Sequence, residues 1–202
     1  MTQFSNIGGV ITLKLRNDEL HILINLVEQL LELLGEGHFK HHYESDDPFA
    51  QMMMQQMMNI EEPISAPEDA VLQRLLPNAY SDPEAQSEFR RYTEPRLRHI
   101  KQGHLLHVRD ALVKPVENEA ESAEIEISEP QQWLIAINDL RLAMATRLQI
   151  NPASFEKYEL MADTDPNKSL HAVYFWLGSL QDSLLGFLGN VYPISTPEID
   201  SN

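Results

Sequence analysis

Cysteine is absent from this chain of 202 residues. Its absence excludes disulfides, catalysis by a thiolate and zinc sites built on cysteine. A chain without cysteine is compatible with a reducing compartment. We therefore expect a cytoplasmic protein whose stability comes from an apolar core.

Basic side chains are scarce relative to acidic ones. The chain has 15 lysines and arginines against 31 aspartates and glutamates, which gives a formal net charge of −16. The negative electrostatic field of such a protein repels the phosphates of nucleic acids and the surfaces of anionic membranes. The one basic locality runs from Arg90 to Arg109, and we interpret its arginines as surface partners of the protein's own acids. Because it lacks a helix-turn-helix pattern, direct DNA binding ranks third among the functional hypotheses.

Long apolar runs are absent as well. No stretch reaches the roughly 18–20 apolar residues that a membrane span requires. The N-terminal sequence MTQFSNIGGV has no basic segment followed by an apolar one. We therefore expect neither a signal peptide nor a contact with membranes.

Helical periodicity is the dominant pattern that is present. Apolar residues recur at intervals of three and four in three long segments, at 17–34, 129–148 and 166–188. Such spacing is typical of amphipathic helices and predicts a mainly α protein, a helical bundle around these three segments. We expect one helical domain over residues 1–190 with a methionine-rich and acidic excursion at 38–69, followed by a flexible tail at 191–202.

Segment 129–148 forms the centre of this prediction. One side of the helix would carry Trp133, Ile137, Leu140, Met144 and Leu148, which follow at steps of three and four. Segment 17–34 is apolar beyond a single stripe, so it needs burial on more than one side. It lies at the centre of the bundle, or it packs against a second copy in a homodimer.

Two short segments alternate between apolar and polar residues. Residues 10–15 place Ile11, Leu13 and Leu15 on one face, and residues 123–128 place Ile125 and Ile127 on one face. This alternation predicts half-buried strands. We expect the two to pair as a small two-stranded β ribbon; the alternative is that both are extended and unpaired.

Asn138 and Asp139 lie inside the apolar segment 129–148. A buried carboxylate without a partner is strongly destabilising, so we expect Asp139 to pair with an arginine from residues 83–109. The predicted structural polar network comprises Asn138, Asp139, Arg141, Arg147, Arg90 and Arg91. No nucleophile–base set is evident, so we assign no catalytic residue and no cofactor.

Two groups of histidines make metal binding an alternative function. His38, His41 and His42 lie close together among acidic residues, and His104 and His107 are three apart on a predicted helix. Imidazoles at such spacing can bind divalent metals. Neither group has further ligands at a matching spacing, so we favour solvated or core-lining histidines and assign no metal site.

Methionine is concentrated in the sequence PFAQMMMQQMMN at residues 48–59. Methionine side chains are flexible and polarisable, and surfaces rich in them bind varied partners. The segment is either an excursion from the bundle or a partner surface formed by Met53, Met54, Met57 and Met58.

Three segments together resemble a known family: LPNAYSDPEAQSEFRRYTEPRLR at 76–98, WLIAINDLRLAMATRL at 133–148 and YFWLGSLQDSL at 174–184. They are similar to an actinobacterial family first catalogued as a domain of unknown function. Its genes lie near that of the Clp-protease adaptor ClpS, and it includes the oxidative-stress regulator AosR. The resemblance spans about residues 12–188 and contains no recognised catalytic motif.

The resemblance implies a regulatory protein that acts on transcription through a sigma factor or another protein partner. The redox-sensing member uses two cysteines four positions apart. This chain has no cysteine, so that switch cannot operate in it. We expect a non-enzymatic cytoplasmic protein that acts in transcription or the stress response through protein contacts. The alternative is a metal-binding or enzymatic helical protein that uses the histidine groups.

Overall fold

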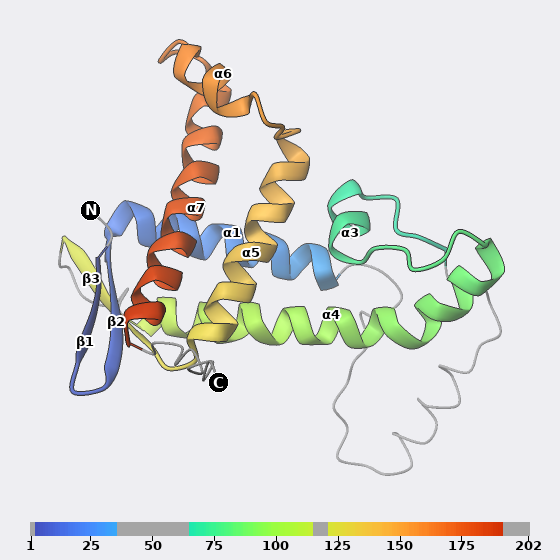
Figure 1. The fold of residues 1–202 in the computed structure, drawn as a ribbon, viewed down its shortest axis with the longest axis horizontal. Helices are drawn as coiled ribbons and strands as arrows, with labels where there is room; N and C mark the ends of the chain where they lie inside the picture. The colour runs from blue at the N-terminus through green and yellow to red at the C-terminus, as the bar shows by residue number, and fades with distance from the viewer. Residues whose placement is uncertain (1–2, 36–64, 115–120, 192–202) are drawn as a thin grey trace, which may run out of the picture.

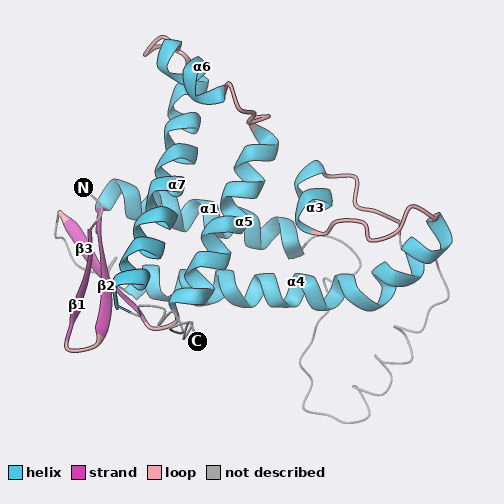
Figure 2. Cartoon of the chain, viewed as in Figure 1, coloured by secondary structure: helices cyan, strands magenta, loops and turns pink. Residues whose placement is uncertain are grey.

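The computed structural model describes residues 3–35, 65–114 and 121–191 (Figure 1). Helices predominate and a small sheet lies at one end of the molecule (Figure 2), which confirms the predicted mainly α class. The elements in chain order are β1 (Gln3–Ile7), β2 (Val10–Arg16), α1 (Asn17–Gly35), α3 (Ala70–Leu75), α4 (Pro83–Val113), β3 (Ser122–Ile127), α5 (Pro130–Arg147), α6 (Ser154–Leu160) and α7 (Pro166–Val191).

The sheet is antiparallel with strand order β1-β2-β3. The predicted pairing of residues 10–15 with 123–128 is confirmed, because Leu13 lies opposite Ile125 in this sheet. The expected number of two strands is wrong, since β1 adds a third strand to β2. Gly8 and Gly9 connect β1 to β2 with positive φ angles of 63° and 91°. Two-residue hairpin turns need such angles, and glycine adopts them without steric strain.

The helices form two layers. α1 and α4 lie lengthwise beside each other, while α5 and α7 cross them and extend away on one side (Figure 1). The bundle therefore includes α4, which packs against both α1 and α5, in addition to the three helices that the sequence predicts. The buried hydrophobic residues from the sheet and from α1, α3, α4, α5 and α7 form a single cluster.

The packing of α5 explains the burial of its apolar stripe. Trp133, Ile137 and Leu140 are buried, whereas Met144 and Leu148 are only half-buried. The first part of α5 crosses the layer of α1 and α4, and its last part extends beyond that layer (Figure 1). Helical periodicity predicts the stripe, but the crossing point of the helices decides which of its residues are enclosed.

α1 buries one stripe, formed by Leu20, Leu23, Val27, Leu30 and Leu34. The remaining apolar side chains of the helix lie at or near the surface, and Ile22 is 37% exposed. α1 packs mainly against α4. Ile24, Leu26, Leu31 and Leu33 are partly buried and pack against the core cluster, and α1 also contacts α5, β2 and β3. Packing against a second copy stays a prediction.

α4 is a single helix that contains Pro95. Asp82 caps its N-terminus by accepting a hydrogen bond from the main-chain N–H of Ala85 at 2.9 Å, and Pro83 occupies the first helical position. Proline inside a helix removes a hydrogen bond and bends the axis, and α4 bends in its N-terminal part (Figure 1). Among the described residues, no helix is long and apolar enough to cross a membrane.

Candidate functional site

Asp139 is buried between α4 and α5, where its Oδ1 accepts a hydrogen bond from the Lys101 ammonium at 2.8 Å. The expected arginine partner is therefore wrong: the cation does come from α4, but it is a lysine. Oδ2 of Asp139 is enclosed without a hydrogen-bond partner in the described structure. This ion pair joins α4 to α5, with the Asp139 side chain 3% exposed and the Lys101 side chain 18% exposed.

A second buried ionic group lies on α4 itself. Glu94 accepts hydrogen bonds from Arg90 at 2.5 Å and from Arg98 at 2.9 Å. All three side chains are at most 6% exposed. Their positions differ by four, so they lie on one side of the helix. Arg90 and Arg98 do pair with an acid of the protein itself, as predicted, but the predicted surface position is wrong because both are buried. The spacing Arg-x-x-x-Glu-x-x-x-Arg is the signal that could have shown it.

The two guanidinium groups also bind the ends of other helices. Arg90 donates from Nη2 to the main-chain oxygen of Leu76 at 3.0 Å, at the C-terminus of α3. Arg98 donates from Nη1 to the main-chain oxygen of Leu34 at 2.9 Å, at the C-terminus of α1. Helix C-termini carry partial negative charge and unpaired carbonyls. The Arg90–Glu94–Arg98 group therefore joins α1 and α3 to α4, which is a structural role.

The remaining members of the predicted network lie apart from these two groups. Asn138 is exposed, and Arg91 lies over the ring of Tyr92 with its Cζ 4.8 Å from the centroid. Arg141 donates to Oε1 of Gln181 on α7 at 2.6 Å. The structure thus does not bring the six predicted residues into one network; it distributes them over separate helix contacts.

Arg147, in the last turn of α5, donates to Oδ2 of Asp69 at 2.6 Å. Asp69 also caps α3 by accepting hydrogen bonds from the main-chain N–H groups of Val71 and Leu72. Burial raises the pKa of Asp69, but the hydrogen bond from Arg147 and the two main-chain hydrogen bonds outweigh it. The pKa of Asp69 therefore lies below its ordinary value.

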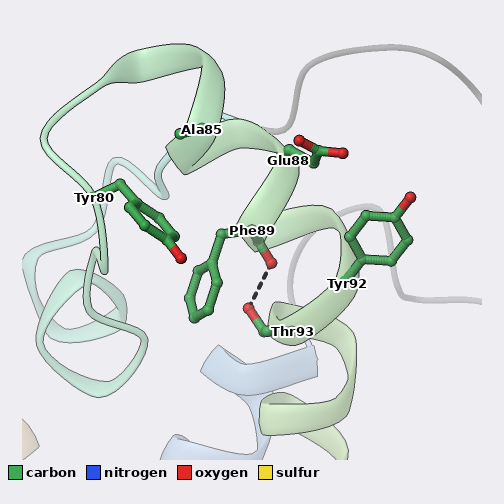
Figure 3. Close-up of a pocket in the computed structure, with 6 residues that line it drawn as sticks. All are labelled: Tyr80, Ala85, Glu88, Phe89, Tyr92 and Thr93. Carbon is green, nitrogen blue, oxygen red and sulfur yellow. Dashed lines mark hydrogen bonds between the residues drawn. The ribbon is translucent and has the colours of Figure 1, made fainter.

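A shallow pocket of about 440 Å³ lies at the start of α4 (Figure 3). Tyr80 and Phe89 meet edge to face there with their ring centroids 5.6 Å apart. Thr93 donates to the main-chain oxygen of Phe89 at 2.7 Å, and Tyr92 points away from Tyr80 and Phe89. Among the polar side chains of this pocket, Tyr80, Glu88 and Tyr92 are exposed, and Thr93 is bonded within α4.

A second pocket, of about 320 Å³, lies where the end of α5, α6 and the start of α7 meet. Its lining is largely polar and includes Arg147, Ser154, Lys157, Asp165 and His171. These side chains come from three helices and the turns between them. No local spacing in the sequence marks them as a group, so the sequence alone does not predict that Ser154, Lys157 and His171 lie together.

The pocket belongs to a projecting part of the molecule, residues 141–176, which we call the arm. It comprises the end of α5, α6 and the first part of α7, and it extends away from α1 and α4 (Figure 1). The only buried side chains of the arm are Ser154 and His171, and both are polar. Its apolar side chains are half-buried or exposed, including Phe155, Leu160 and Leu170.

Of the histidine and methionine groups noted in the sequence, only His104 and His107 lie among the described residues. His104 and His107 lie half-buried on α4, with Nδ1 of the first and Nε2 of the second enclosed without a hydrogen-bond partner. Over residues 3–35, 65–114 and 121–191, no three side chains of the ligand types lie close enough to hold a metal ion. The groups at His38, His41 and His42 and at Met53, Met54, Met57 and Met58 lie outside the described residues.

Comparison with known proteins gives one match. A family model described as a domain of unknown function, DUF2017, matches residues 1–188 of the chain. No curated protein and no solved structure matches it.

Proposed function

The chain belongs to the DUF2017 family, a domain of unknown function, and we propose that it is a non-enzymatic regulatory protein that binds another protein through its arm. The single observation that carries this proposal is that no apolar side chain of residues 141–176 is fully buried. Leu160 is 87% exposed, Phe155 53% and Leu170 47%. Apolar side chains that a chain leaves exposed together mark surfaces for partner proteins.

The formal charge of the arm also supports its role as the binding surface. The arm has four basic residues, Arg141, Arg147, Lys157 and Lys168, and four acidic ones, Glu156, Glu159, Asp163 and Asp165. It is therefore neutral in formal charge, whereas the whole chain carries −16. A negatively charged partner meets less repulsion at the arm than elsewhere on the molecule, and burial of apolar side chains can drive association.

The class of partner comes from the resemblance of the sequence to a family that includes an oxidative-stress regulator. On that basis we propose a partner from the transcription machinery, such as a sigma factor, and a role in transcription or the stress response in the cytoplasm. A cysteine-based redox switch has no place in this proposal, because the chain has no cysteine.

Capture of partners from native extract, measured by quantitative mass spectrometry, tests the proposal. The immobilised full chain is compared with the variant Leu160→Ser/Leu170→Ser and with the control Leu106→Ser, whose side chain is 38% exposed on α4. We expect at least one transcription protein to bind the wild type and the control but not the arm variant. Equal capture by all three proteins contradicts the proposal.

Metal binding is a second candidate, because buried ring nitrogens of His104 and His107 have no hydrogen-bond partner in the described structure. Two imidazoles supply half of a tetrahedral zinc site, and the other ligands would have to come from outside the described residues. Titration with Zn²⁺ or Ni²⁺ tests this candidate. A chain that releases no heat and keeps its melting temperature does not bind these metals.

A further inference from the structure

Arg141 is a half-buried side chain at the base of the arm, where α5 meets α7. Its Nη1 donates to Oε1 of Gln181 at 2.6 Å, and its Cζ lies 5.7 Å from the ring centroid of Tyr174. The guanidinium also lies against Gly178, where a Cβ atom would be 3.4 Å from Nη2. Tyr174, Gly178 and Gln181 follow at steps of four and three, so they share one side of α7. Successive turns of α7 therefore position the guanidinium.

No carboxylate pairs with this guanidinium in the part of the chain that the structure describes. The chain has 31 acidic residues, so the lack of a partner does not follow from a shortage of acids. Most other basic side chains that are buried or half-buried do form an ion pair there: Arg90, Arg98, Lys101, Arg109 and Lys168. Of the described basic side chains that are not exposed, only Arg91 shares this lack with Arg141.

Arg141 also has hydrogen-bond donors to spare. A guanidinium carries several N–H groups in a planar fork, and Gln181 accepts from only one of them. Within the described residues Nε is enclosed without a partner, while Nη2 has no partner either but is not enclosed. A carboxylate can accept from Nη1 and Nη2 together, which is among the stronger hydrogen-bonded contacts in proteins. The position of Arg141 is therefore ready for an anion that comes from another molecule.

Aromatic rings continue from Arg141 across the arm. The ring centroids of Tyr174 and Phe175 are 5.3 Å apart. Phe175 in turn lies 5.3 Å from Phe155 and 5.2 Å from Tyr158, both on α6. Phe155 is exposed and the other three rings are half-buried. An arginine beside partly exposed aromatic rings is the composition that is enriched at the centres of protein interfaces.

We propose that the protein bound by the arm presents an acidic side chain to Arg141 and apolar side chains to the adjacent rings. Its carboxylate accepts hydrogen bonds from Nη1 and Nη2. Its apolar side chains cover Phe155 and Leu170, which precedes Tyr174 by one turn on the same side of α7. This inference rests on the function proposed above, because it states the chemistry of the segment that the arm recognises.

Other occupants of this surface fit less well. Nucleic acids offer phosphates to arginine and bases to aromatic rings, but a chain with a formal charge of −16 repels their backbone. A second copy of the chain brings the same charge of −16 with it. A small carboxylate would pair with Arg141 but would leave Phe155, which is 53% exposed, in contact with water. A peptide segment needs to bring only one carboxylate and can cover the rings.

Selection of random linear peptides displayed on phage against the immobilised full chain tests the inference. The wild type should enrich peptides that combine an aspartate or a glutamate with apolar residues. The affinity of an enriched peptide, measured by fluorescence polarisation, should fall about tenfold for Arg141→Met, as expected on loss of a charge-assisted hydrogen bond. Arg91→Met is the matched control, because Arg91 is also half-buried without a carboxylate but lies on α4. It should leave the affinity unchanged.

A second peptide, in which the amide replaces the acid, completes a double-mutant cycle. It should bind the wild type about tenfold more weakly, and Arg141→Met should weaken its binding no further. Circular dichroism checks that each variant is folded. The inference is overturned if the wild type enriches no peptide or only peptides without an acid. It is overturned equally if the effects of the two changes are additive.

The variant Leu160→Ser/Leu170→Ser separates this inference from the proposed function. An enriched peptide that loses affinity for this variant but binds Arg141→Met like the wild type overturns the inference and leaves the arm as a protein-binding surface. A peptide that binds both variants like the wild type contradicts the proposed function as well. If Arg141→Met instead abolishes self-association of the chain or binding of single-stranded RNA, the anion comes from a different occupant and the inference is overturned.

Discussion

Arg98 on α4 donates from Nη1 to the main-chain oxygen of Leu34, which lies 2.9 Å away and 64 positions earlier in the chain. The same guanidinium binds Glu94 through Nε and Nη2. One side chain thus neutralises a carboxylate and terminates a helix from another part of the chain. A point mutation in this group therefore affects the packing of α1 on α4 as well as an ion pair.

Replacement of the central carboxylate should be strongly destabilising. Glu94→Ala leaves the buried guanidiniums of Arg90 and Arg98 without their anion. Removal of one partner from a buried ionic group typically costs about 3–5 kcal/mol, and we expect a loss of that size in the free energy of unfolding measured in urea. Glu88→Ala, at an exposed position of the same helix, is the control and should change it by less than about 0.5 kcal/mol. A loss below about 1 kcal/mol for Glu94→Ala would show that the group is not structural.

Local signals in the sequence predict much of this fold. Apolar periodicity identifies α5 and α7, and alternation identifies β2 and β3 with their pairing. Asp82 and Asp165, each followed by proline, mark the starts of α4 and α7. These signals work because capping and amphipathicity depend on neighbours within one or two turns.

Contacts that depend on where two helices cross cannot be predicted from such local sequence signals. Lys101 reaches Asp139 because of the position at which α4 crosses α5, and no spacing within either segment fixes that position. The burial of Arg90 and Arg98 contradicts the general preference of arginine for the surface. The pocket of the arm assembles Lys157 and His171 from different helices, so only the folded chain shows it.

Lys101 and Asp139 should be energetically coupled. Lys101→Met leaves a buried carboxylate without a cation, and we expect a loss of about 2–4 kcal/mol in the free energy of unfolding. The double variant Lys101→Met/Asp139→Leu removes both charges and should lose less than the single variant, because apolar residues can replace a buried pair at little cost. A double-mutant cycle measures the coupling. Additive effects of the two substitutions would contradict a direct interaction.

Acid should weaken the contact between α3 and α5. The folded-state pKa of Asp69 is lowered below its ordinary value, so the group contributes stability above its unfolded pKa, and this contribution is lost as the pH falls through the folded pKa. Asp69→Asn preserves an N-cap but removes the charge. The difference in unfolding free energy between wild type and variant should therefore shrink between about pH 5 and pH 2.

Arg147→Met is the matched variant for this contact, because the hydrogen bond from Arg147 is the largest of the effects that lower the pKa of Asp69. It should lose part of the same pH-dependent stability while leaving the main-chain hydrogen bonds of Asp69 in place. Urea unfolding of the three proteins over that pH range provides the measurement. A difference between wild type and Asp69→Asn that stays constant with pH would contradict the assignment.

Gln149 has a φ of 53° and is the only residue other than glycine with a positive φ in the described chain. It follows the end of α5, where the main-chain N–H of Ile150 donates to the oxygen of Ala145 at 2.9 Å. Helices commonly end in this way with glycine, because other residues are strained in the left-handed conformation. Gln149→Gly should therefore raise the free energy of unfolding by about 0.5–1 kcal/mol. Gln29→Gly, inside α1, is the control with the same change of side chain and should lower it by about 1 kcal/mol. If both substitutions destabilise the protein equally, the strain at Gln149 does not exist in solution.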